Sequence, residues 1–291
     1  MKKIKKAIIP VAGFGTRFLP ASKSQPKEML SLVDKPVIQY IVEEAVNSGI
    51  EQIIFITSSI KRALEDHFDR NFELEYRLRE KKKIKQLKEI MAISDMAKFV
   101  YIRQKNPLGD GHAILCAKDL IDDDEPVAVL FGDDIVDAKT PCLKQMIDVY
   151  EKYQDPVIAA LEVPNKDIKN YGCIDGQEIE ERVIGVKGLV EKPEPAKAPS
   201  NLAVIGKYII TPDIFKALEK IGKGKHADGE IRLIDGFLQV LKKRNVIAYK
   251  FEGNRYDCGD KLGFLKANVA FGLKHPDLKK DFRKFLKQNN F

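Results

Sequence analysis

Short runs of apolar residues alternate with helical patterns in the first half of the sequence, and this alternation constrains the fold most. The apolar runs have strand length and occur at 6–12, 52–57, 99–102, 126–131 and 157–163. Helical spacing lies between them at 37–49, opened by Pro36, and at 112–120 and 143–153. Repeated strand–helix–strand units build a parallel sheet covered by helices. The sequence therefore predicts an α/β fold with a Rossmann-like, mostly parallel open sheet and helices on both faces.

The second half of the sequence mixes shorter strand patterns with helices. β-like runs occur at 183–190, 202–210 and 246–251, helical patterns at 213–221 and 231–243, and the chain from 261 onward also has helical character. No linker, internal repeat or low-complexity tract interrupts the chain. We therefore expect a single domain over 1–291, with a β-rich annex and a helical C-terminus.

The composition excludes several classes of protein. Hydrophobic residues make up 44% and charged residues 32% of the chain, which excludes a disordered or collagen-like protein. No apolar stretch reaches the roughly 18 residues of a membrane helix, and the apolar run after the basic N-terminus is too short for a signal peptide. The four cysteines are far apart, which favours reduced thiols over disulfides or a zinc site. We therefore expect a cytoplasmic protein with no membrane partner.

The net charge of +7 raises the question of nucleic-acid binding. The basic excess is concentrated in residues 1–35, 61–90 and 272–291. In 61–90 the two signs interleave around Ile84 and Leu87, which predicts a solvated amphipathic helix. No series of aromatic residues accompanies these lysines, as single-strand binding would favour. We therefore expect no nucleic-acid partner, and a basic nucleic-acid binder is the weakest alternative.

The loop after the first predicted strand combines glycines with cations. Gly13 and Gly15 bring backbone N–H groups close to a bound anion, and Arg17 can pair with phosphate oxygens. Lys23 and Lys27 follow, so three cations could neutralise a triphosphate. The spacing matches neither the Walker motif nor G-x-G-x-x-G. A plain tight turn and a solvated basic loop therefore remain alternatives to phosphate binding.

Carboxylates lie at two other predicted loops. Asp133 and Asp134 follow the run 126–131, where adjacent negative charges need a cation or hydrogen bonds. Mg²⁺ prefers one or two carboxylates plus phosphate oxygens, so Asp133 is a candidate ligand, whereas Asp134 suits a helix N-cap or a turn. Asp257 lies in the turn-like segment 255–260, where it is a second candidate acid or an ordinary turn residue.

Other polar side chains follow further strands. Gln104 follows 99–102, and an amide can pair with both the donor and the acceptor of a nucleobase edge. Glu191 and Lys192 combine an acid for sugar hydroxyls with a cation for phosphate, although such neighbours are common on any surface. Ligands of open α/β sheets bind at the carboxyl ends of the strands, so we expect these residues to gather in one site.

Together these motifs resemble those of the sugar-1-phosphate nucleotidyltransferases. The resemblance spans nearly the whole chain and rests on segments 12–20, 23–29, 35–40, 103–104, 107–113, 133–135, 171–172, 190–193, 201–204 and 228–231. Within that superfamily, the block Pro26–Met29 is similar to the bacterial uridylyltransferases that act on glucose 1-phosphate. The chain departs from the family pattern at Ser22, Asp110, Phe131-Gly132 and Tyr256.

The resemblance implies roles for the candidate residues. A nucleotide-binding part of about 1–165 would use Ala12, Gly13, Gly15, Thr16, Glu28, Gln104, Gly111 and Asp133, the uracil being contacted by Ala12, Gly13, Glu28, Gln104 and Gly111. A sugar-binding part of about 166–260 would use Gly172, Glu191 and Val204, and C-terminal helices would follow at about 261–291. Arg17, Lys27 and Lys192 would be the catalytic cations, while Asp133 and Asp257 would hold Mg²⁺.

The implied activity joins UTP and glucose 1-phosphate, giving UDP-glucose and pyrophosphate. A sugar phosphate is already an anionic nucleophile near neutral pH, so positioning and charge neutralisation suffice without a catalytic Ser, His or Cys. Family members tend to form dimers or tetramers, so we expect a homodimer or homotetramer. A thymidylyltransferase making dTDP-glucose is the nearest alternative, because one methyl group is worth only ~1–3 kcal/mol of discrimination. A non-catalytic sugar-nucleotide-binding protein is another.

Overall fold

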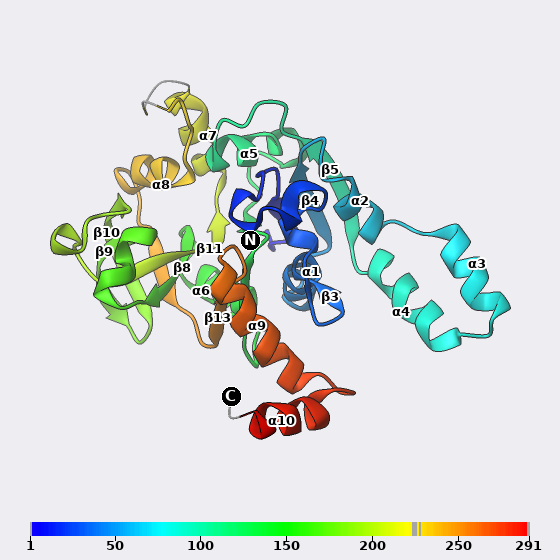
Figure 1. The fold of residues 1–291 in the computed structure, drawn as a ribbon. Helices are drawn as coiled ribbons and strands as arrows, with labels where there is room; N and C mark the ends of the chain where they lie inside the picture. The colour runs from blue at the N-terminus through cyan, green and yellow to red at the C-terminus, as the bar shows by residue number, and fades with distance from the viewer. Residues whose placement is uncertain (1, 223–225, 227, 290–291) are drawn as a thin grey trace.

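A computed structural model describes residues 2–222, 226 and 228–289 of the chain. Within these residues nine strands form one sheet (Figure 1). Their order across the sheet is β5 (Lys98–Arg103), β4 (Gln52–Thr57), β1 (Lys6–Pro10), β6 (Val127–Leu130), β11 (Leu202–Ile210), β8 (Val157–Glu162), β12 (Ile247–Lys250), β10 (Val183–Glu191) and β9 (Gly172–Glu180). Strands β5, β4, β1 and β6 run parallel, as predicted, and their carboxyl ends share one edge.

The sheet becomes mixed beyond β6. Strand β11 enters between β6 and β8 and runs antiparallel to both, whereas β12 runs parallel to β8. Strand β10 is antiparallel to β12 and to β9. Strand β9 was not predicted, because most of its residues are exposed and carry no alternating apolar signal. Its pairing with β10 and β11 is what makes it a strand, and together these strands form the β-rich annex.

Helices cover both faces of the sheet, as the sequence predicted. Helices α1 (Val37–Asn47) and α6 (Cys142–Tyr153) lie on one face, and α5 (Asp110–Leu115), α7 (Pro212–Ile221) and α8 (Leu233–Leu241) lie on the other. The described residues also form the helices α2 (Arg62–Phe68), α3 (Phe72–Glu80), α4 (Ile84–Ser94), α9 (Lys261–Lys274) and α10 (Lys279–Gln288). Among the described residues, none of these helices has both the length and the apolar character needed to cross a membrane.

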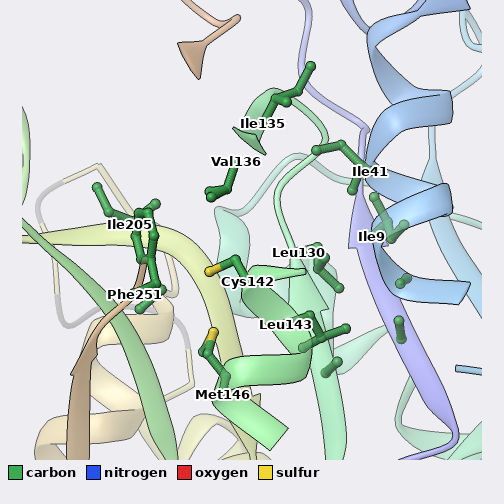
Figure 2. Packing of buried hydrophobic residues seen from close by; sticks show 14 of the residues in the cluster. Ile9, Ile41, Leu130, Ile135, Val136, Cys142, Leu143, Met146, Ile205 and Phe251 are labelled. Atoms are coloured by element: carbon green, nitrogen blue, oxygen red, sulfur yellow. The ribbon is translucent and has the colours of Figure 1, made fainter. Parts of the chain in front are cut away.

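Two hydrophobic clusters lie on opposite faces of the sheet, because successive strand residues point to opposite sides. Ile9 on β1 packs with α1 and α6 in one cluster, whereas its neighbour Ile8 packs with α5, α7 and α8 in the other. Figure 2 shows part of the first cluster, where Leu143 of α6 lies near Leu130 of β6, while Cys142 and Met146 of the same helix point toward the side of Ile205 and Phe251. Burial on both faces explains why these strands are apolar along their whole length.

The charged segment 61–90 forms three helices instead of one. Asn71 caps α3 by accepting a hydrogen bond from the Leu74 N–H at 3.0 Å, and Lys82 adopts a left-handed φ of 53° between α3 and α4. Helices α3 and α4 extend away from the sheet (Figure 1), so the prediction of a solvated amphipathic surface is correct but a continuous helix is wrong. Local caps, which the charge pattern does not encode, make the breaks.

Pro36 and the helix after Gln104 also differ slightly from expectation. Pro36 ends the short strand β3 (Lys35–Pro36), paired with β2 (Ser31–Leu32), and precedes the first residue of α1 instead of occupying it. Helix α5 ends at Leu115, and the predicted remainder of that helix is a separate 3-10 turn at Lys118–Leu120. At the C-terminus α9 and α10 confirm the helical prediction through residue 288, while residues 290–291 lie outside the described part.

A buried ion pair links three elements of the first cluster. Lys207 on β11 donates from Nζ to Glu44 Oε2 on α1 at 2.9 Å, and Glu44 Oε1 accepts from the backbone N–H of Leu143 at 3.0 Å. Both charged side chains are buried. Because neither charge faces water, each depends on the other for compensation.

We expect Glu44→Ala to lower the free energy of unfolding by about 3–5 kcal/mol, because it leaves a buried ammonium unpaired. Glu43→Ala is the matched control, since Glu43 pairs with Lys35 at 2.8 Å in a half-exposed setting and should cost less than about 1 kcal/mol. Urea unfolding of both variants measures the difference. Equal destabilisation by the two substitutions would contradict the assigned role of the buried pair.

Candidate active site

Four loops meet at the shared edge where the parallel strands end. β1 leads into the glycine loop, β4 into Lys61, β5 into Gln104 and β6 into Asp133. The short strand β7 (Asp134–Asp137) follows directly and pairs antiparallel with β13 (Asn254–Asp257). This pairing places Asp257 opposite Asp134. Loops distant in sequence therefore contribute to one site, as the topology predicted.

Two neighbouring cavities occupy this edge. The large cavity, of about 610 Å³, is lined by seven of the predicted residues, namely Arg17, Asp133, Gly172, Glu191, Lys192, Val204 and Asp257. The small cavity, of about 290 Å³, is lined by another set, namely Ala12, Gly13, Lys27, Glu28, Gln104 and Asp133. Asp133 borders both cavities and lies at their junction.

Four candidates line neither cavity. Gly15 has a left-handed φ of 67° and its carbonyl accepts a hydrogen bond from Ser22 Oγ at 2.7 Å, so it shapes the turn that carries Arg17. Thr16 begins the 3-10 turn Thr16–Phe18, and Lys23 is exposed. Gly111 donates its backbone N–H to the Ile231 carbonyl at 2.9 Å. The predicted nucleotide contacts of Gly15, Thr16 and Gly111 remain predictions.

Lys27 and Asp133 form a contact at the junction of the cavities. Lys27 Nζ lies 2.5 Å from Asp133 Oδ2, and both side chains are about one-fifth exposed, at 23% and 22%. Burial alone would lower the pKa of Lys27, but the carboxylates of Asp133 and Glu28 outweigh it and the pKa is raised. Lys27 therefore stays cationic at the point where the two cavities meet. The repulsion expected between Asp133 and Asp134 is relieved on this side by Lys27.

Arg255 relieves the repulsion on the other side. Its Nε donates to Asp134 Oδ1 at 2.5 Å, one terminal nitrogen donates to Asp257 Oδ2 at 3.2 Å, and the other donates to the Tyr171 hydroxyl at 3.1 Å. The two carboxylates overcome the effect of burial and raise the pKa of Arg255. Burial raises the pKa of Asp257, and the nearby Asp134 raises it further. Arg255 therefore neutralises the acids that the β7–β13 pairing brings together.

One sequence interpretation of these acids is wrong, and the other two are correct in part. Asp134 is not a helix cap, because it begins β7 and its Oδ2 accepts from the Gly206 N–H at 3.0 Å; its backbone N–H closes the preceding turn by donating to the Phe131 carbonyl at 3.4 Å. Asp257 ends strand β13 and also opens the turn that follows, since its Oδ1 accepts from the Gly259 N–H at 2.9 Å. Strand pairing between segments more than a hundred residues apart therefore adds to the local turn composition and does not replace it.

The carboxylates of Asp133 and Asp257 converge beside Gly259. A Cβ atom placed on Gly259 would lie 2.5 Å from Asp133 Oδ2 and 3.1 Å from Asp257 Oδ1. The absence of a side chain there leaves a space bounded by two carboxylate oxygens. In the described part of the chain, no group of three or more His, Cys, Asp or Glu residues is arranged to hold a metal. A site with two carboxylates suits an ion whose other ligands are water and phosphate oxygens, which is the chemistry of Mg²⁺.

The small cavity has an acid and an amide at its wall. The Glu28 side chain is 2% exposed, and burial raises its pKa while Lys61 and Lys27 oppose the change. The Gln104 amide donates to the Gly109 carbonyl at 3.1 Å and contacts His112 Nδ1 at 2.9 Å, so its orientation is set by the protein. These groups supply a fixed set of donors and acceptors suited to a planar polar ring.

Asp110, one of the departures from the family pattern, borders both cavities. Its Oδ1 accepts from the backbone N–H of Gly111 at 2.7 Å and of Leu233 at 3.0 Å. Asp110 therefore joins the first residues of α5 and α8. Burial raises the pKa of this carboxyl, and the two backbone N–H groups counteract it. Its role in the described structure is to hold two helix N-termini together beside the site.

The candidates for sugar binding line the large cavity and not the small one. A Cβ on Gly172 would lie 3.3 Å from Val204 Cγ2 and 3.5 Å from Glu191 Oε2, so these three residues are immediate neighbours. Lys192 follows β10 with a left-handed φ of 44°, and its backbone N–H donates to the Tyr171 carbonyl at 3.0 Å. Its side chain is 59% exposed, and its ammonium lies 3.5 Å from Glu191 Oε1.

Arg255 and Lys61 contribute to the site, although no role was predicted for them from the sequence. Alternation along a strand could have found Arg255, because residues two apart point to the same face and Asp257 was already a candidate. Lys61 carries no such signal, since it lies in a segment full of exposed lysines. Only the fold brings it to Glu28, at 2.7 Å.

The fold and the site define an α/β enzyme with cations and acids at the carboxyl ends of parallel strands, where nucleotide-binding sites of such folds lie. The family model for nucleotidyl transferases matches residues 6–272, and the chain belongs to that family. Members of this family generally use a divalent metal ion. The resemblance seen in the sequence is thereby confirmed.

Three relatives within this family are similar to the chain over nearly its whole length. The chain is 52% identical over 285 residues to the UTP–glucose-1-phosphate uridylyltransferase YngB of Bacillus subtilis (strain 168), covering 98% of this chain and 95% of the relative. A UTP-bound UDP-glucose pyrophosphorylase from Acinetobacter baumannii superposes with a TM-score of 0.90 at 43% identity, covering 97% and 98% of the two chains. A UDP-glucose pyrophosphorylase in complex with UDP-glucose superposes with a TM-score of 0.84 at 44% identity, covering 94% and 100%.

Proposed function

We propose that this enzyme transfers the uridylyl group of UTP to glucose 1-phosphate, releasing UDP-glucose and pyrophosphate. The observation that carries the proposal is the junction of the two cavities, where Lys27 and Asp133 lie between the wall formed by Glu28 and Gln104 and the pocket of Glu191 and Lys192. The α-phosphorus of a nucleotide with its base in the small cavity would lie at this junction. The relatives named for this reaction support the same assignment.

The chain's own residues stabilise charge in this reaction. A phosphate oxygen of glucose 1-phosphate attacks the α-phosphorus of UTP, a new P–O bond forms, and the bond to the departing pyrophosphate breaks in line. Arg17 and Lys27 neutralise the phosphates of UTP, while Lys192 holds the phosphate of the sugar. Gly172, Glu191 and Val204 fix the sugar ring. Such transfer depends on positioning and charge neutralisation, so no side-chain base is needed.

Asp133 and Asp257 would hold Mg²⁺. The ion would supply positive charge that polarises phosphate oxygens and orients the two anions. Arg255 keeps Asp257 in place by binding its second oxygen. We assign residues of about 1–165 to the nucleotide and about 166–260 to the sugar.

We expect Gly259→Ala to reduce kcat roughly tenfold and to raise the magnesium concentration needed for half-maximal activity, because its Cβ would displace the two carboxylates. The control is Gly188→Ala on β10, whose Cβ would make only ordinary contacts, at 3.7 Å and beyond. Magnesium titrations of both variants measure the effect. An unchanged magnesium requirement in Gly259→Ala would argue against a metal between Asp133 and Asp257.

Pyrophosphate release from UTP, dTTP, CTP and ATP in the presence of glucose 1-phosphate and Mg²⁺ tests the reaction itself. We expect UTP to give the highest kcat/KM, with UDP-glucose as product. Equal or faster turnover of dTTP would identify a thymidylyltransferase, since uracil and thymine share one pairing edge. Binding of sugar nucleotides without pyrophosphate release would identify a non-catalytic binding protein.

Two further proposals concern the compartment and the oligomeric state of the enzyme. We propose that the enzyme acts in the cytoplasm, since its four cysteines are free and a reducing compartment suits them. We also propose a homodimer or homotetramer, on the family resemblance. Size-exclusion chromatography with light scattering measures the latter directly, and a monomer would contradict it.

A further inference from the structure

A second buried ion pair lies behind the wall of the small cavity. Glu28 lines this cavity, whereas Lys61 lines neither cavity and is only 1% exposed. Lys61 Nζ donates to Glu28 Oε2 at 2.7 Å. Glu28 comes from the 3-10 turn Lys27–Met29, and Lys61 immediately precedes α2. Lys61 therefore does not contact a nucleotide in the small cavity, whereas its partner Glu28 can.

Two cations face the Glu28 carboxylate, and they differ in their other contacts. Lys27 is bound to Asp133 and belongs to the groups proposed to neutralise phosphate, so other anions share its charge. Lys61 is buried away from both cavities, beside Glu28. Burial raises the pKa of Glu28 above its ordinary value, and the two lysines offset only part of this rise. When Lys27 engages a nucleotide, Lys61 remains as the cation that compensates Glu28.

The backbone at Gly132 also fixes the direction of Glu28. A Cβ on Gly132 would lie 2.8 Å from Val11 Cγ1 and 3.3 Å from Glu28 Cγ. The stem of Glu28 therefore lies against a backbone that has no room for a side chain. This contact gives a physical reason for the glycine in the Phe131-Gly132 departure from the family pattern. Gly132 therefore packs against the stem of Glu28, while Lys61 binds its carboxylate.

We propose that Lys61 is a positioning residue for base recognition, which holds Glu28 ionised and in one orientation as a hydrogen-bond acceptor at the small cavity. The inference rests on the proposed function, which places the uracil ring in that cavity. A carboxylate only accepts hydrogen bonds, whereas a protonated carboxyl group also donates. Uracil presents a ring N–H where cytosine presents a lone pair. An ionised Glu28 therefore favours uracil nucleotides.

The substitution Lys61→Met tests this role. We expect the Kd for UTP, measured by calorimetry, and the KM for UTP to rise at least about tenfold, while the KM for glucose 1-phosphate changes less than about twofold. Discrimination of UTP against CTP should fall. Without Lys61 the Glu28 carboxyl keeps its proton to higher pH than in the wild type, so the fall of the KM for UTP with rising pH should set in at higher pH in the variant. A pH profile of the KM for UTP that is the same in both enzymes would contradict this.

Lys207→Met is the matched control, because Lys207 is also a fully buried lysine paired with a glutamate but lies in the core. It should lower stability and leave the Kd for UTP unchanged. The double variant Glu28→Gln/Lys61→Met carries no buried charge from the pair and should bind UTP as Glu28→Gln alone does. If Lys61→Met alone fails to fold, UTP binding by the double variant and by Glu28→Gln can still be compared.

Three results would overturn the inference. The first is an unchanged Kd for UTP in Lys61→Met, and the second is an equal rise of this Kd in Lys207→Met. The third is a rise of the Kd in the double variant that equals the product of the rises in the two single variants. Different results would refute the proposed function. Wild-type enzyme that binds UTP but releases no pyrophosphate would refute the transfer reaction and leave the effect of Lys61 on UTP binding measurable. Wild-type enzyme that does not bind UTP would refute both.

Discussion

Asp133→Ala should reduce kcat by about 10³-fold while the protein stays folded. Asp133 lies at the junction of the two cavities, contacts Lys27 at 2.5 Å and, with Asp257, bounds the space beside Gly259. Its removal takes away both a proposed metal ligand and the partner that orients Lys27. The fold should persist because the hydrogen bond that ties this loop to Cys258 uses the Asp133 backbone carbonyl, at 2.8 Å, which the substitution retains.

Pyrophosphate release at saturating UTP, glucose 1-phosphate and magnesium measures the effect. Asp137→Ala is the control, because Asp137 lies on the same strand, β7, but pairs with Lys274 outside both cavities. Its kcat should stay within about twofold of wild type. Near-normal kcat of Asp133→Ala at saturating magnesium would refute the assignment of Asp133 to the reacting centre.

Lys192→Ala should raise the KM for glucose 1-phosphate roughly 100-fold and leave the KM for UTP within about threefold. A hydrogen bond to a charged group contributes about 1.5–3 kcal/mol, and each 1.4 kcal/mol corresponds to a factor of ten. Lys192 lines the large cavity with Glu191, whereas Glu28 and Gln104 line only the small cavity. The substitution should therefore weaken the binding of glucose 1-phosphate and not that of UTP.

Steady-state kinetics with each substrate varied in turn separate the two KM values. Lys197→Ala is the control, because Lys197 is an exposed lysine on a nearby 3-10 turn and lines neither cavity. It should leave both constants unchanged. Equal increases in the two KM values of Lys192→Ala would count against a specific contact with the sugar phosphate.

Elements with a local apolar pattern were predicted from the sequence, whereas those that depend on pairing with distant strands were missed. β4 is found with its exact bounds, and α6 within one residue, because each buries apolar residues in a pattern that recurs within a few positions. Strand β9 is missed because it is polar and exposed, and it becomes a strand only by pairing with β10. The antiparallel entry of β11 into the sheet is likewise set by its neighbours.

The candidate site was likewise predicted only in part from the sequence. The residue types at the strand ends, including Arg17, Lys27 and Asp133, were identified from composition and spacing, and their family roles came from the resemblance. The sequence also showed that two adjacent aspartates need compensating charge, but it did not show the source. The structure supplies that charge from Lys27 on one side and Arg255 on the other.

The sequence by itself determined the α/β class, the parallel strands and the chemical groups placed at their ends, because periodicity and turn composition are local properties of the chain. The tertiary structure decided which groups meet: Lys61 with Glu28, Arg255 with Asp134, and Asp133 with Asp257 beside Gly259. These partners lie dozens to more than a hundred residues apart. Their contacts arise from sheet order and helix packing, which depend on the burial of the whole chain and not on any one segment.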